Sequence, residues 1–485
     1  MIYPSINEFG ELSKSGKAVP VIMEIPGDYY TPISIFSSLV EKDEGFLLES
    51  VENGERLGRY SFIGRKPFMT LEVKKGVINI NRGKERYKIQ GDPFKEIKKI
   101  MSLYKTVKLK KSPPFTGGAI GFFGYDTVKY FEEIPEPLID DLKMPEIHLM
   151  LFDEVIAYDH LKSRVQLIVN VAPAEEIEET YCKAVERLKI LAEKISKSRN
   201  SISVQDLSLY DKKREVKFES SFTREEFCSA VKKAKNYIKK GDVFQVVISQ
   251  RLAVNSDIPP FQAYRKLRGL NPSPYMYYIN FGEYQVVGSS PEMLVKTSGS
   301  EVETNPIAGT RRRGKDELED EKLANELLQD SKEIAEHMML VDLGRNDIGR
   351  VARFGTVKVI EQMKVEKYSH VMHLVSRITG EMRDDADMFD ALKACLPAGT
   401  VSGAPKVRAM EIIYELEKQK RGLYAGAVGY VSFDGNLDTC IAIRTILFKS
   451  GKAYIQAGAG IVADSIPDKE YEETLNKAKA LLEVI

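Results

Sequence analysis

Two segments of the sequence carry glutamates at a spacing that suits metal binding. Glu333 and Glu336 are three residues apart, and so are Glu470 and Glu473. Residues three or four apart share one face of a helix, so each segment can direct two carboxylates at one point. A single pair of this kind is more often a solvated acidic face. Two such helices facing each other would form an all-oxygen Mg²⁺ site with space for water and a substrate carboxylate.

Three other segments carry groups that could hold an anion. AGAGIV at 457–462 is expected to follow a strand and to present backbone N–H groups to a ligand, because glycine permits close approach. PAGTVSGAPK at 397–406 is expected to lead into a helix N-terminus, which attracts anions. Read alone, both segments are more often plain turns. PIAGTRRRG at 306–314 fits a surface loop and an anion clamp equally well.

Polar residues also occur inside apolar runs. Arg444 lies within CIAIRTI, which reads as a strand, and a buried guanidinium there needs a partner. A carboxylate ligand would match its fork, although a structural ion pair or a solvent-facing position would explain it too. His370 and His373 lie at VMHLVS, where a histidine is more often a core residue than a catalyst. Together these residues predict an enzyme with a paired-carboxylate metal site that handles an anionic small molecule, but they do not identify its reaction.

The elements that must position these groups fall into two regions. Residues 19–170 mix short strand-like runs with turns, and a helix is expected at about 174–196. The segment after it is rich in Ser, Lys and Asp and has no apolar period, as is typical of a linker. We therefore expect an N-terminal region at 1–195, a linker at 196–221 and a second region at 222–485.

The second region opens with a strong helix signal. Thr223 and Glu226 form a capping box, and an apolar face follows through Ile238. A strand is expected at 243–254. Further helices are expected at about 316–341, 384–395, 403–419 and 467–484. Strand-like runs often follow one another without a helix between them, so the pattern favours an α+β fold with antiparallel sheets over a doubly wound parallel fold.

Composition limits the classes of function. The chain has 485 residues, of which 43% are hydrophobic, and 71 basic residues balance 71 acidic ones. This balance argues against a general nucleic-acid binder. No apolar run reaches the roughly 20 residues needed to cross a bilayer, and the N-terminus lacks a secretory pattern, so we expect no membrane association. The four cysteines are scattered and form no C-x-x-C pair, which is typical of a protein in a reducing cytoplasm.

A series of motifs runs through the second region over about 222–480. They are GDVFQVVISQR, NPSPYMYY, GSSPEMLV, ETNPIAGTRRRG, DSKEIAEHMMLVDLGRNDIGRV, VMHLVSRITG, PAGTVSGAPKVRAMEII, YAGAVGY, CIAIRTI, AGAGIV and DKEYEETLNKAKA. Together, and with LLES at 47–50, they resemble the chorismate-utilising enzymes, specifically the anthranilate synthase component I family. The resemblance implies that family's fold, in which large, mainly antiparallel sheets pack as a sandwich with helices on the outside.

The resemblance implies a role for each candidate residue. Glu336 and Glu473 would bind Mg²⁺, with Glu333 and Glu470 beside them. His373 would contact the C4 hydroxyl that leaves. The implied catalytic residues are His373, Glu336 and Thr310. The residues implied to hold chorismate are Gly309, Thr310, Thr400, Tyr424, Arg444, Lys477 and the backbone of Gly458, Ala459 and Gly460.

The resemblance also implies the reaction. Ammonia would add at C2 of chorismate, hydroxide would leave C4 with help from His373, and loss of pyruvate would give anthranilate, the first committed step of tryptophan biosynthesis. Isochorismate and salicylate synthases carry lysine at the position of Gln245, and aminodeoxychorismate synthases carry lysine at the position of Ala308. An amide and a methyl group can serve neither as that base nor as that nucleophile, so both differences favour ammonia as the attacking group.

The source of the ammonia and the point at which the reaction stops are separate questions. No cysteine lies in a glutaminase nucleophile motif, which implies a separate glutamine amidotransferase subunit and a hetero-oligomer. One alternative function is an aminodeoxyisochorismate synthase that stops before pyruvate loss. Another is a non-catalytic regulator that binds chorismate or an amino acid, which the presence of His373 and the metal glutamates disfavours.

An inhibitor site for L-tryptophan is also implied by the resemblance. It would comprise Ser50 of LLES and Pro274, Tyr275 and Met276 of NPSPYM. Ser50 and the adjacent Glu49 offer polar groups for an ammonium, and the other three residues offer apolar and aromatic surface for an indole. The pattern alone favours an ordinary strand and an ordinary turn at these segments.

Overall fold

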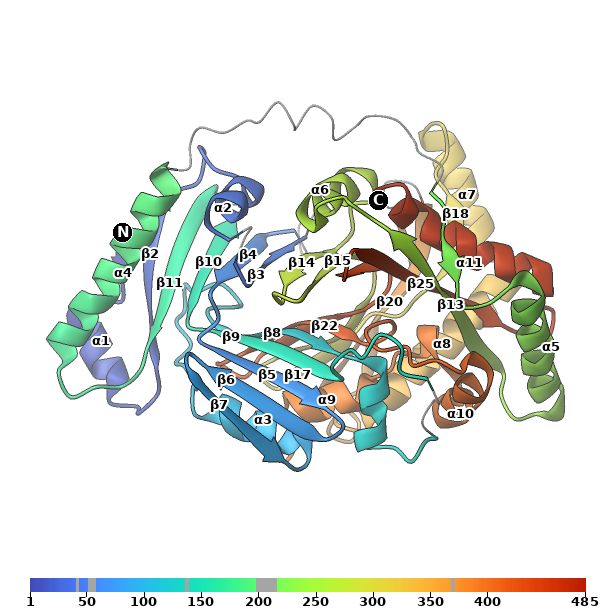
Figure 1. Cartoon of the computed structure of the whole chain (residues 1–485), viewed down its shortest axis with the longest axis horizontal. Helices are drawn as coiled ribbons and strands as arrows, with labels where there is room; N and C mark the ends of the chain where they lie inside the picture. The colour runs from blue at the N-terminus through green and yellow to red at the C-terminus, as the bar shows by residue number, and fades with distance from the viewer. Residues whose placement is uncertain (41–42, 51–57, 136–138, 198–215, 368–370) are drawn as a thin grey trace.

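Two large antiparallel β-sheets form the body of the protein (Figure 1). The computed structural model describes residues 1–40, 43–50, 58–135, 139–197, 216–367 and 371–485. In spatial order, the strands of the first sheet are β1 (Ile2–Tyr3), β2 (Val19–Pro26), β11 (Arg164–Val171), β10 (Glu154–Asp159), β4 (Tyr60–Arg65), β3 (Gly45–Glu49), β14 (Tyr275–Asn280), β15 (Tyr284–Ser290), β24 (Thr445–Lys449), β25 (Lys452–Ile461), β13 (Gln245–Asn255) and β12 (Glu219–Ser220), and β21 (Gly403–Ala404) also pairs with β13. Those of the second sheet are β18 (Ile307–Arg312), β20 (Val371–Glu381), β17 (Glu301–Thr304), β16 (Met293–Ser298), β23 (Leu437–Ile441), β22 (Ala427–Ser432), β8 (Gly118–Phe123), β9 (Ile147–Phe152), β5 (Met69–Lys74), β6 (Val77–Arg82) and β7 (Glu85–Gln90), and β19 (Lys358–Lys367) also pairs with β20.

The two sheets enclose a shared hydrophobic core. Phe46 of β3 and Phe152 of β9 meet there edge to face, with their ring centroids 4.9 Å apart. Both side chains are almost completely buried. Removing either ring would leave a cavity and would cost about 3–5 kcal/mol. Contacts of this kind hold the two sheets in a fixed position relative to each other and so fix the distance between their ends.

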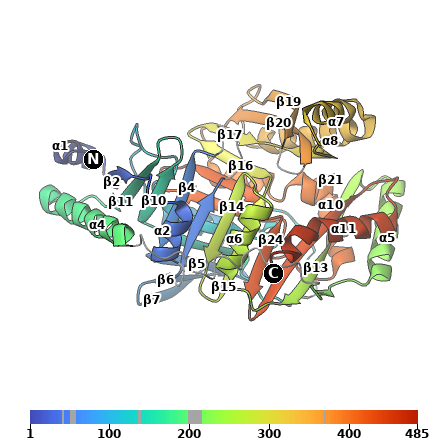
Figure 2. The same ribbon diagram turned by 90° about the horizontal axis from the view of Figure 1, so that it is seen from above.

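Helices cover the outside of this sandwich (Figures 1 and 2). α4 packs on β2 and β11, α6 packs on β14 and β15, α8 packs on β18 and β20, and α11 packs on β25. The helices are α1 (Ile6–Ser13), α2 (Pro32–Leu39), α3 (Pro93–Ser102), α4 (Ile177–Lys197), α5 (Arg224–Lys240), α6 (Pro260–Leu270), α7 (Glu317–Gln329), α8 (Ser331–Gly349), α9 (Met388–Cys395), α10 (Lys406–Glu417) and α11 (Pro467–Leu482). The expected α+β sandwich of antiparallel sheets is therefore confirmed.

The two sequence regions share both sheets. Leu48 of β3 pairs with Tyr277 of β14 in the first sheet, and Gly121 of β8 pairs with Gly429 of β22 in the second. The segments assigned to 1–195 and 222–485 thus each supply one side of both sheets, and they join at the β3–β14 and β8–β22 pairs. Of the expected linker, residues 198–215 lie outside the described part of the chain.

The start of α5 and the boundary between α7 and α8 are both set by side chains that cap the helix ends. At α5, the Thr223 hydroxyl accepts from the Glu226 N–H at 3.2 Å, and the Glu226 carboxylate accepts from the Thr223 N–H at 2.9 Å, so the capping box is confirmed. The single helix expected at 316–341 is wrong. Asp330 ends α7 and caps α8, because its carboxylate accepts from the N–H groups of residues 332 and 333.

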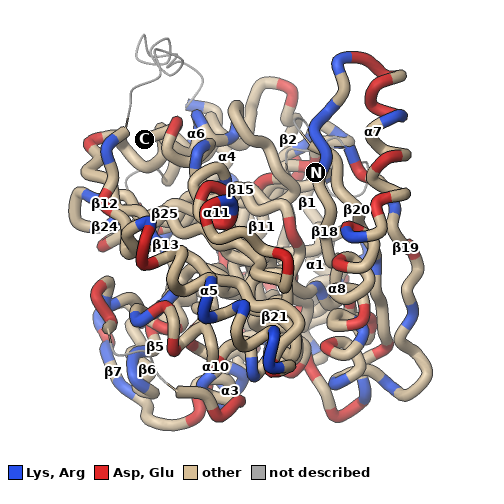
Figure 3. Tube along the Cα trace, turned by 90° about the vertical axis from the view of Figure 1, so that its right-hand side faces the viewer, with Lys and Arg blue, Asp and Glu red and all other residues tan. Residues whose placement is uncertain are grey.

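Two further expectations from the sequence concern the distribution of charge and the presence of membrane-spanning helices. Figure 3 shows Lys and Arg interspersed with Asp and Glu, in keeping with the balanced net charge. Among the described helices, none combines the length and the apolarity that a membrane crossing would require.

Candidate active site

A cavity of about 650 Å³ lies where the ends of the two sheets approach each other. β13 and β25 of the first sheet form one wall, and β18 and β20 of the second form another. α8 contributes residues from its N-terminal half, and α11 contributes residues along its length from Glu470 to Leu481. The volume falls within the range of about 300–1,000 Å³ that is usual for small-molecule sites.

Most of the residues expected at the substrate and metal sites line this cavity. They are Gly309, Thr310, Glu333, Glu336, His373, Thr400, Tyr424, Arg444, Gly458, Gly460, Glu470, Glu473 and Lys477. Ala459 differs, because its methyl group is buried behind β25 in a cluster with Phe227 and Val246. Neighbouring residues of a strand point to opposite faces, so only the two glycines of Gly458–Gly460 face the cavity.

The four expected metal carboxylates come from α8 and α11. Burial raises the pKa of Glu336, and the nearby charges of Glu333 and Glu473 raise it further. Burial also raises the pKa of Glu470, and Glu473 adds to the effect. The two pairs on facing helices thus repel one another across the cavity, a cost that a bound cation would relieve.

Cations of the protein already contact two of these four carboxylates. Lys477 lies 2.7 Å from Glu473, and Arg311 lies 3.2 Å from Glu333. In the described part of the chain, no three acidic, histidine or cysteine side chains are grouped closely enough to hold one ion. The donor chemistry therefore fits Mg²⁺, but the protein supplies only part of a coordination shell, and water and a substrate carboxylate would have to complete it.

The glycines of AGAGIV form part of a strand, and the expectation that they follow one is wrong. Gly458 and Gly460 belong to β25, paired with Ser249 and Val247 of β13. A Cβ at Gly458 would lie 2.8 Å from the Tyr424 hydroxyl oxygen. A Cβ at Gly460 would be crowded by a glutamine side chain. Both positions therefore need glycine, because neighbouring side chains approach the strand closely there.

Arg444 lies between two strands, so its expected position inside one is also wrong. β23 ends at Ile441 in the second sheet and β24 begins at Thr445 in the first, and Arg444 has a positive φ of 50° at the crossing. Its guanidinium donates to the backbone carbonyl of Lys477. Burial lowers its pKa, but the group stays charged. A charge with so little local compensation is suited to a carboxylate ligand.

Thr400 lies in the loop that was expected to lead into a helix. It lies in a single 3₁₀ turn at Gly399–Val401, and α10 begins only at Lys406. Its hydroxyl is buried and interacts with the Glu292 carboxyl, whose pKa it lowers. Thr400 therefore places a hydroxyl beside Glu292 in the cavity wall, and the N-terminus of α10 does not line the cavity.

His373 and Thr310 face each other across β20 and β18. His373 Nδ1 lies 3.0 Å from the Gly309 carbonyl oxygen and 3.1 Å from Thr310 Oγ1. A carbonyl can only accept, so we assign the proton of the neutral ring to Nδ1. Burial lowers the pKa of His373, which keeps the imidazole neutral at neutral pH. This state suits hydrogen bonding to a substrate hydroxyl better than donation of a proton.

Glu292 is a cavity residue that the sequence did not single out. It is only 7% exposed and lies just before β16. Burial raises its pKa to about 8, and the Thr400 hydroxyl, the Ile307 N–H and the charge of Lys477 offset the effect only in part. Glu292 is therefore a carboxylic acid at neutral pH and can donate a proton into the cavity. An acidic residue inside the apolar run SSPEMLV was the available signal.

The three arginines of PIAGTRRRG form neither a surface loop nor an anion clamp. They belong to β18 and its end, and they pair with acidic residues. Arg311 contacts Asp330 at 2.6 Å, while Arg312 and Arg313 contact carboxylates of α7. The ion pairs tie β18 to α7 and α8 and thereby support the wall that carries Gly309 and Thr310.

A second hollow, of about 140 Å³, contains the residues expected to bind tryptophan. Ser50, Pro274, Tyr275 and Met276 all line it, between the two sheets. The Ser50 hydroxyl is buried without a hydrogen-bond partner in the described part of the chain. The hollow is smaller than usual ligand sites, so an indole would have to displace neighbouring side chains.

Glu49 is less suited to the ammonium than the sequence suggested. Its carboxylate accepts hydrogen bonds from the Tyr264 hydroxyl at 2.6 Å and from Arg268 Nε at 2.9 Å. The charge is thus already paired. Asp438 also lines the hollow, but it accepts from the Tyr275 hydroxyl at 3.0 Å and lies 3.5 Å from Lys296, so its charge is paired as well.

Comparisons with known proteins agree with this geometry. Residues 44–483 match the family model described as chorismate binding enzyme. The chain is 53% identical to anthranilate synthase component 1 of Acetivibrio thermocellus over 100% of this chain and 99% of that protein. It is 48% identical to the protein of the same name from Aquifex aeolicus, over 99% of this chain and 97% of that one. The crystal structure of anthranilate synthase component I from Streptococcus pneumoniae superposes with a TM-score of 0.77 at 39% identity, covering 94% of this chain and 98% of that one.

Proposed function

This chain belongs to the chorismate-binding enzyme family, alongside anthranilate synthase component 1, and we propose that it aminates chorismate with ammonia and then eliminates pyruvate to give anthranilate. The observation that carries the proposal is the make-up of one cavity. Carboxylates from α8 and α11 line this cavity and are suited to bind a cation. Arg444 and Lys477 line it too, and their positive charges are suited to bind a dianionic substrate. The aminating relatives support the choice of reaction.

Mg²⁺ is the cation that we propose for the acidic side. Glu336 and Glu473 would hold it, with Glu333 and Glu470 beside them. Burial raises the pKa of Glu336 and of Glu470, and the charges of neighbouring glutamates raise both further, which supports this assignment. A bound Mg²⁺ would neutralise charge on the substrate carboxylate as charge shifts in the ring.

The protein's own residues would hold the substrate and move a proton. Arg444 and Lys477 would pair with the carboxylates of chorismate, and Tyr424 would close the cavity beside Gly458. Ammonia would form a bond to C2, the ring double bond would shift, and the C4 hydroxyl would leave as water after taking a proton. Glu292 is the proposed proton donor because it is protonated at neutral pH, and His373 would hydrogen-bond to the departing hydroxyl.

The attacking group follows from two neutral side chains. Gln245 lines the cavity where related water-adding enzymes carry lysine, and Ala308 lines it where a covalent mechanism would need lysine. Neither can activate water or attack chorismate. Ammonia is therefore the proposed nucleophile, and a separate glutamine amidotransferase subunit is its proposed source, which makes the assembly a hetero-oligomer in the cytoplasm.

Feedback by L-tryptophan is the proposed regulation. Its site would be the hollow around Ser50 and residues 274–276, which joins β3 of the N-terminal region to β14 of the second region. Tryptophan and chorismate would each weaken the binding of the other, because inhibition at a distance requires reciprocal coupling at equilibrium.

One experiment separates this proposal from its nearest alternative. The purified chain is incubated with chorismate, Mg²⁺ and ammonium, and the products are resolved by chromatography. Anthranilate and pyruvate in equal amounts support the proposal. Accumulation of aminodeoxyisochorismate without pyruvate would instead assign the enzyme that stops after amination, and no product would return the chain to a binding role.

A further inference from the structure

A buried ion pair lies directly behind the catalytic cavity. Arg421 is only 2% exposed and Glu417 is 6% exposed. Arg421 Nε donates to one oxygen of Glu417 at 2.8 Å, and Nη2 donates to the other at 2.5 Å. Neither residue lines the cavity. A bidentate pair of this kind is strong, but in a protein interior it often contributes no more stability than apolar residues of the same shape.

Three other contacts of Arg421 lead to cavity-lining residues. Nη1 donates to the Val401 carbonyl at 2.7 Å, and Nη2 donates to the Val247 carbonyl at 2.8 Å. The guanidinium also lies over the ring of Tyr424, 5.5 Å from its centroid. Val247, Val401 and Tyr424 come from β13, the 3₁₀ turn and the segment before β22, and all three line the cavity. One planar cation thus fixes three separate segments of the wall.

Glu417 extends this arrangement to a fourth lining residue. It accepts from the N–H of Ser249 at 2.7 Å and from its hydroxyl at 3.0 Å. The same hydroxyl accepts from Gln456 Nε2 at 2.8 Å, and Gln456 lines the cavity on β25. The ion pair therefore sets the position of both strands of the first-sheet wall.

Arg421 also contacts an aromatic residue of the N-terminal region. Its guanidinium lies 4.7 Å from the ring centroid of Tyr125, which is completely buried. Arg421 thus has cation–π contacts with two tyrosine rings, one of which does not line the cavity. Lysine could supply the charge at this place, but not the planar fork that donates to two carbonyls.

We propose that Arg421, held by Glu417 and Tyr125, is a positioning residue that sets the Tyr424 ring and the Val247 and Val401 backbone for catalysis. This inference rests on the proposed function only in that the cavity is where chorismate reacts. Displacing reacting groups by about 1 Å can cost about 100-fold in rate, so a small movement of this wall would be visible in turnover.

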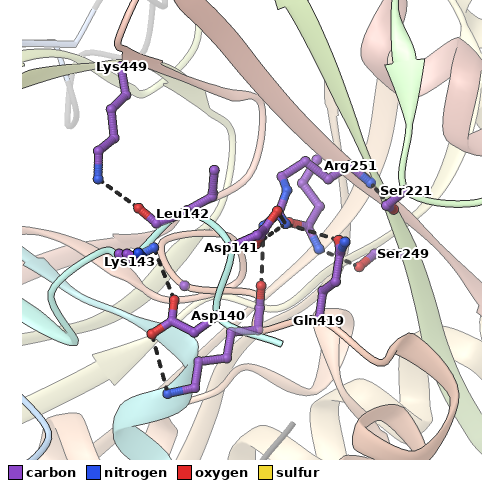
Figure 4. A network of polar contacts seen from close by, with 12 residues as sticks. Asp140, Asp141, Leu142, Lys143, Ser221, Ser249, Arg251, Gln419 and Lys449 are labelled. Carbon is purple, nitrogen blue, oxygen red and sulfur yellow. Dashed lines mark hydrogen bonds and ion pairs between the residues drawn. The ribbon is translucent and has the colours of Figure 1, made fainter. Parts of the chain in front are cut away.

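Arg251 provides a matched control, because it is also a buried arginine beside the same strand. It is 7% exposed, its Nη2 contacts Asp141 at 2.6 Å, and it donates to Gln419 at 3.0 Å (Figure 4). None of these partners lines the cavity. Arg251 itself lies in β13, so Arg251→Lys tests the loss of a buried arginine fork whose side-chain partners do not line the cavity.

The test compares Arg421→Lys with Arg251→Lys in the full chain. Thermal unfolding, chorismate affinity by calorimetry and ammonia-dependent turnover are measured for both. We expect Arg421→Lys to lower kcat by about 10- to 100-fold at a melting temperature close to that of Arg251→Lys, which should keep near-normal kcat. Equal kcat in the two variants at equal stability would overturn the proposal.

A second variant guards against simple misfolding. Tyr125→Leu leaves the four hydrogen bonds of Arg421 to residues 247, 401 and 417 possible but removes one covering ring, and Tyr125→Phe keeps the ring. We expect Tyr125→Leu to lower kcat severalfold and Tyr125→Phe to leave it unchanged. Crystal structures of Arg421→Lys and of the parent chain give a readout that does not depend on the reaction. A displaced Tyr424 ring supports the inference even if the chain proves inactive on chorismate, and an unmoved ring overturns it.

Discussion

Replacing Glu292 by glutamine tests the proton donor with the least change in shape. Burial holds the pKa of Glu292 at about 8. At pH 7 about 90% of the carboxyl groups then carry the proton, and at pH 9 only about 10% do. Activity that depends on the acid form should therefore fall about tenfold between these values. Glutamine has no acidic proton, and loss of general acid catalysis typically costs about 10²–10⁴-fold in turnover.

The assay must separate this titration from that of the nucleophile. Ammonium releases ammonia as the pH rises, which would mask the loss of the acid, so the total ammonium is adjusted to keep free ammonia constant. Anthranilate formation is then followed from pH 6 to pH 9.5 for the parent chain, Glu292→Gln and a control, Glu301→Gln, on the exposed start of β17. The parent and the control should lose activity through about pH 8, and Glu292→Gln should be slow throughout with no step at that pH.

The same pKa shift predicts a stability effect that does not require turnover. The folded state binds the Glu292 proton more tightly than the unfolded state, because the folded pKa lies above the usual value of 4.5. Its contribution to stability is complete below pH 4.5 and is lost as the pH rises to about 8. Glu292→Gln lacks this loss, so from pH 5.5 to 7.5 it should gain on the parent by up to about 2.7 kcal/mol. If Glu292→Gln keeps parental turnover and the parental pH profile, Glu292 is not the donor.

Four further predictions concern nitrogen, metal, histidine and feedback. The isolated chain should use ammonium but not glutamine, and anthranilate formed from glutamine by the pure chain would contradict this. Glu336→Ala and Glu473→Ala should abolish activity at low Mg²⁺ and leave the fold intact, whereas Glu472→Ala on the exposed face of α11 should not; near-normal activity of the first two would show the metal assignment to be wrong. His373→Ala should lower kcat more than it weakens chorismate binding, and unchanged kcat would make His373 a structural residue. Tryptophan at about 100 times its dissociation constant should stabilise the chain by roughly 2.7 kcal/mol, and the effect should disappear in Ser50→Phe; binding that survives this change would place the site elsewhere.

The sequence predicted the fold class and the gathering of the site through local signals. The capping box at Thr223 and the helical spacing of Glu470 and Glu473 depend on neighbouring residues, and both were read correctly. Motif resemblance then brought together residues from 309 to 477, which line one cavity. Periodicity alone could not do this, because it carries no information on which elements meet in space.

Other features were misread because tertiary structure overrides local pattern. CIAIRTILF is apolar throughout, yet the chain leaves the second sheet and enters the first at Arg444. The apolar pattern continues across this crossing because both strands are buried. Asp330 interrupts an otherwise continuous helical pattern, and its capping role becomes visible only with the N–H groups it accepts from.

The sequence did not single out Glu292 or Arg421, and the proposed role of each depends on its buried surroundings. Desolvation raises the pKa of Glu292 to about 8, and no pattern in a single sequence reports desolvation. Arg421 acts through contacts to three segments of the cavity wall, of which Val247 is the most distant in the chain. The sharing of both sheets by the two regions was hidden for the same reason, because strand partners such as Leu48 and Tyr277 lie far apart in sequence.

The most direct test of the proposed reaction is anthranilate formation by the chain alone. Purified protein, chorismate, Mg²⁺ and ammonium at alkaline pH are followed by fluorescence, and the absence of tryptophan from the chain keeps the protein background low. We predict saturable, Mg²⁺-dependent appearance of anthranilate with an equal amount of pyruvate, both abolished by Glu336→Ala. Chorismate that is consumed to another product, or that is bound without turnover under these conditions, would contradict the proposed reaction.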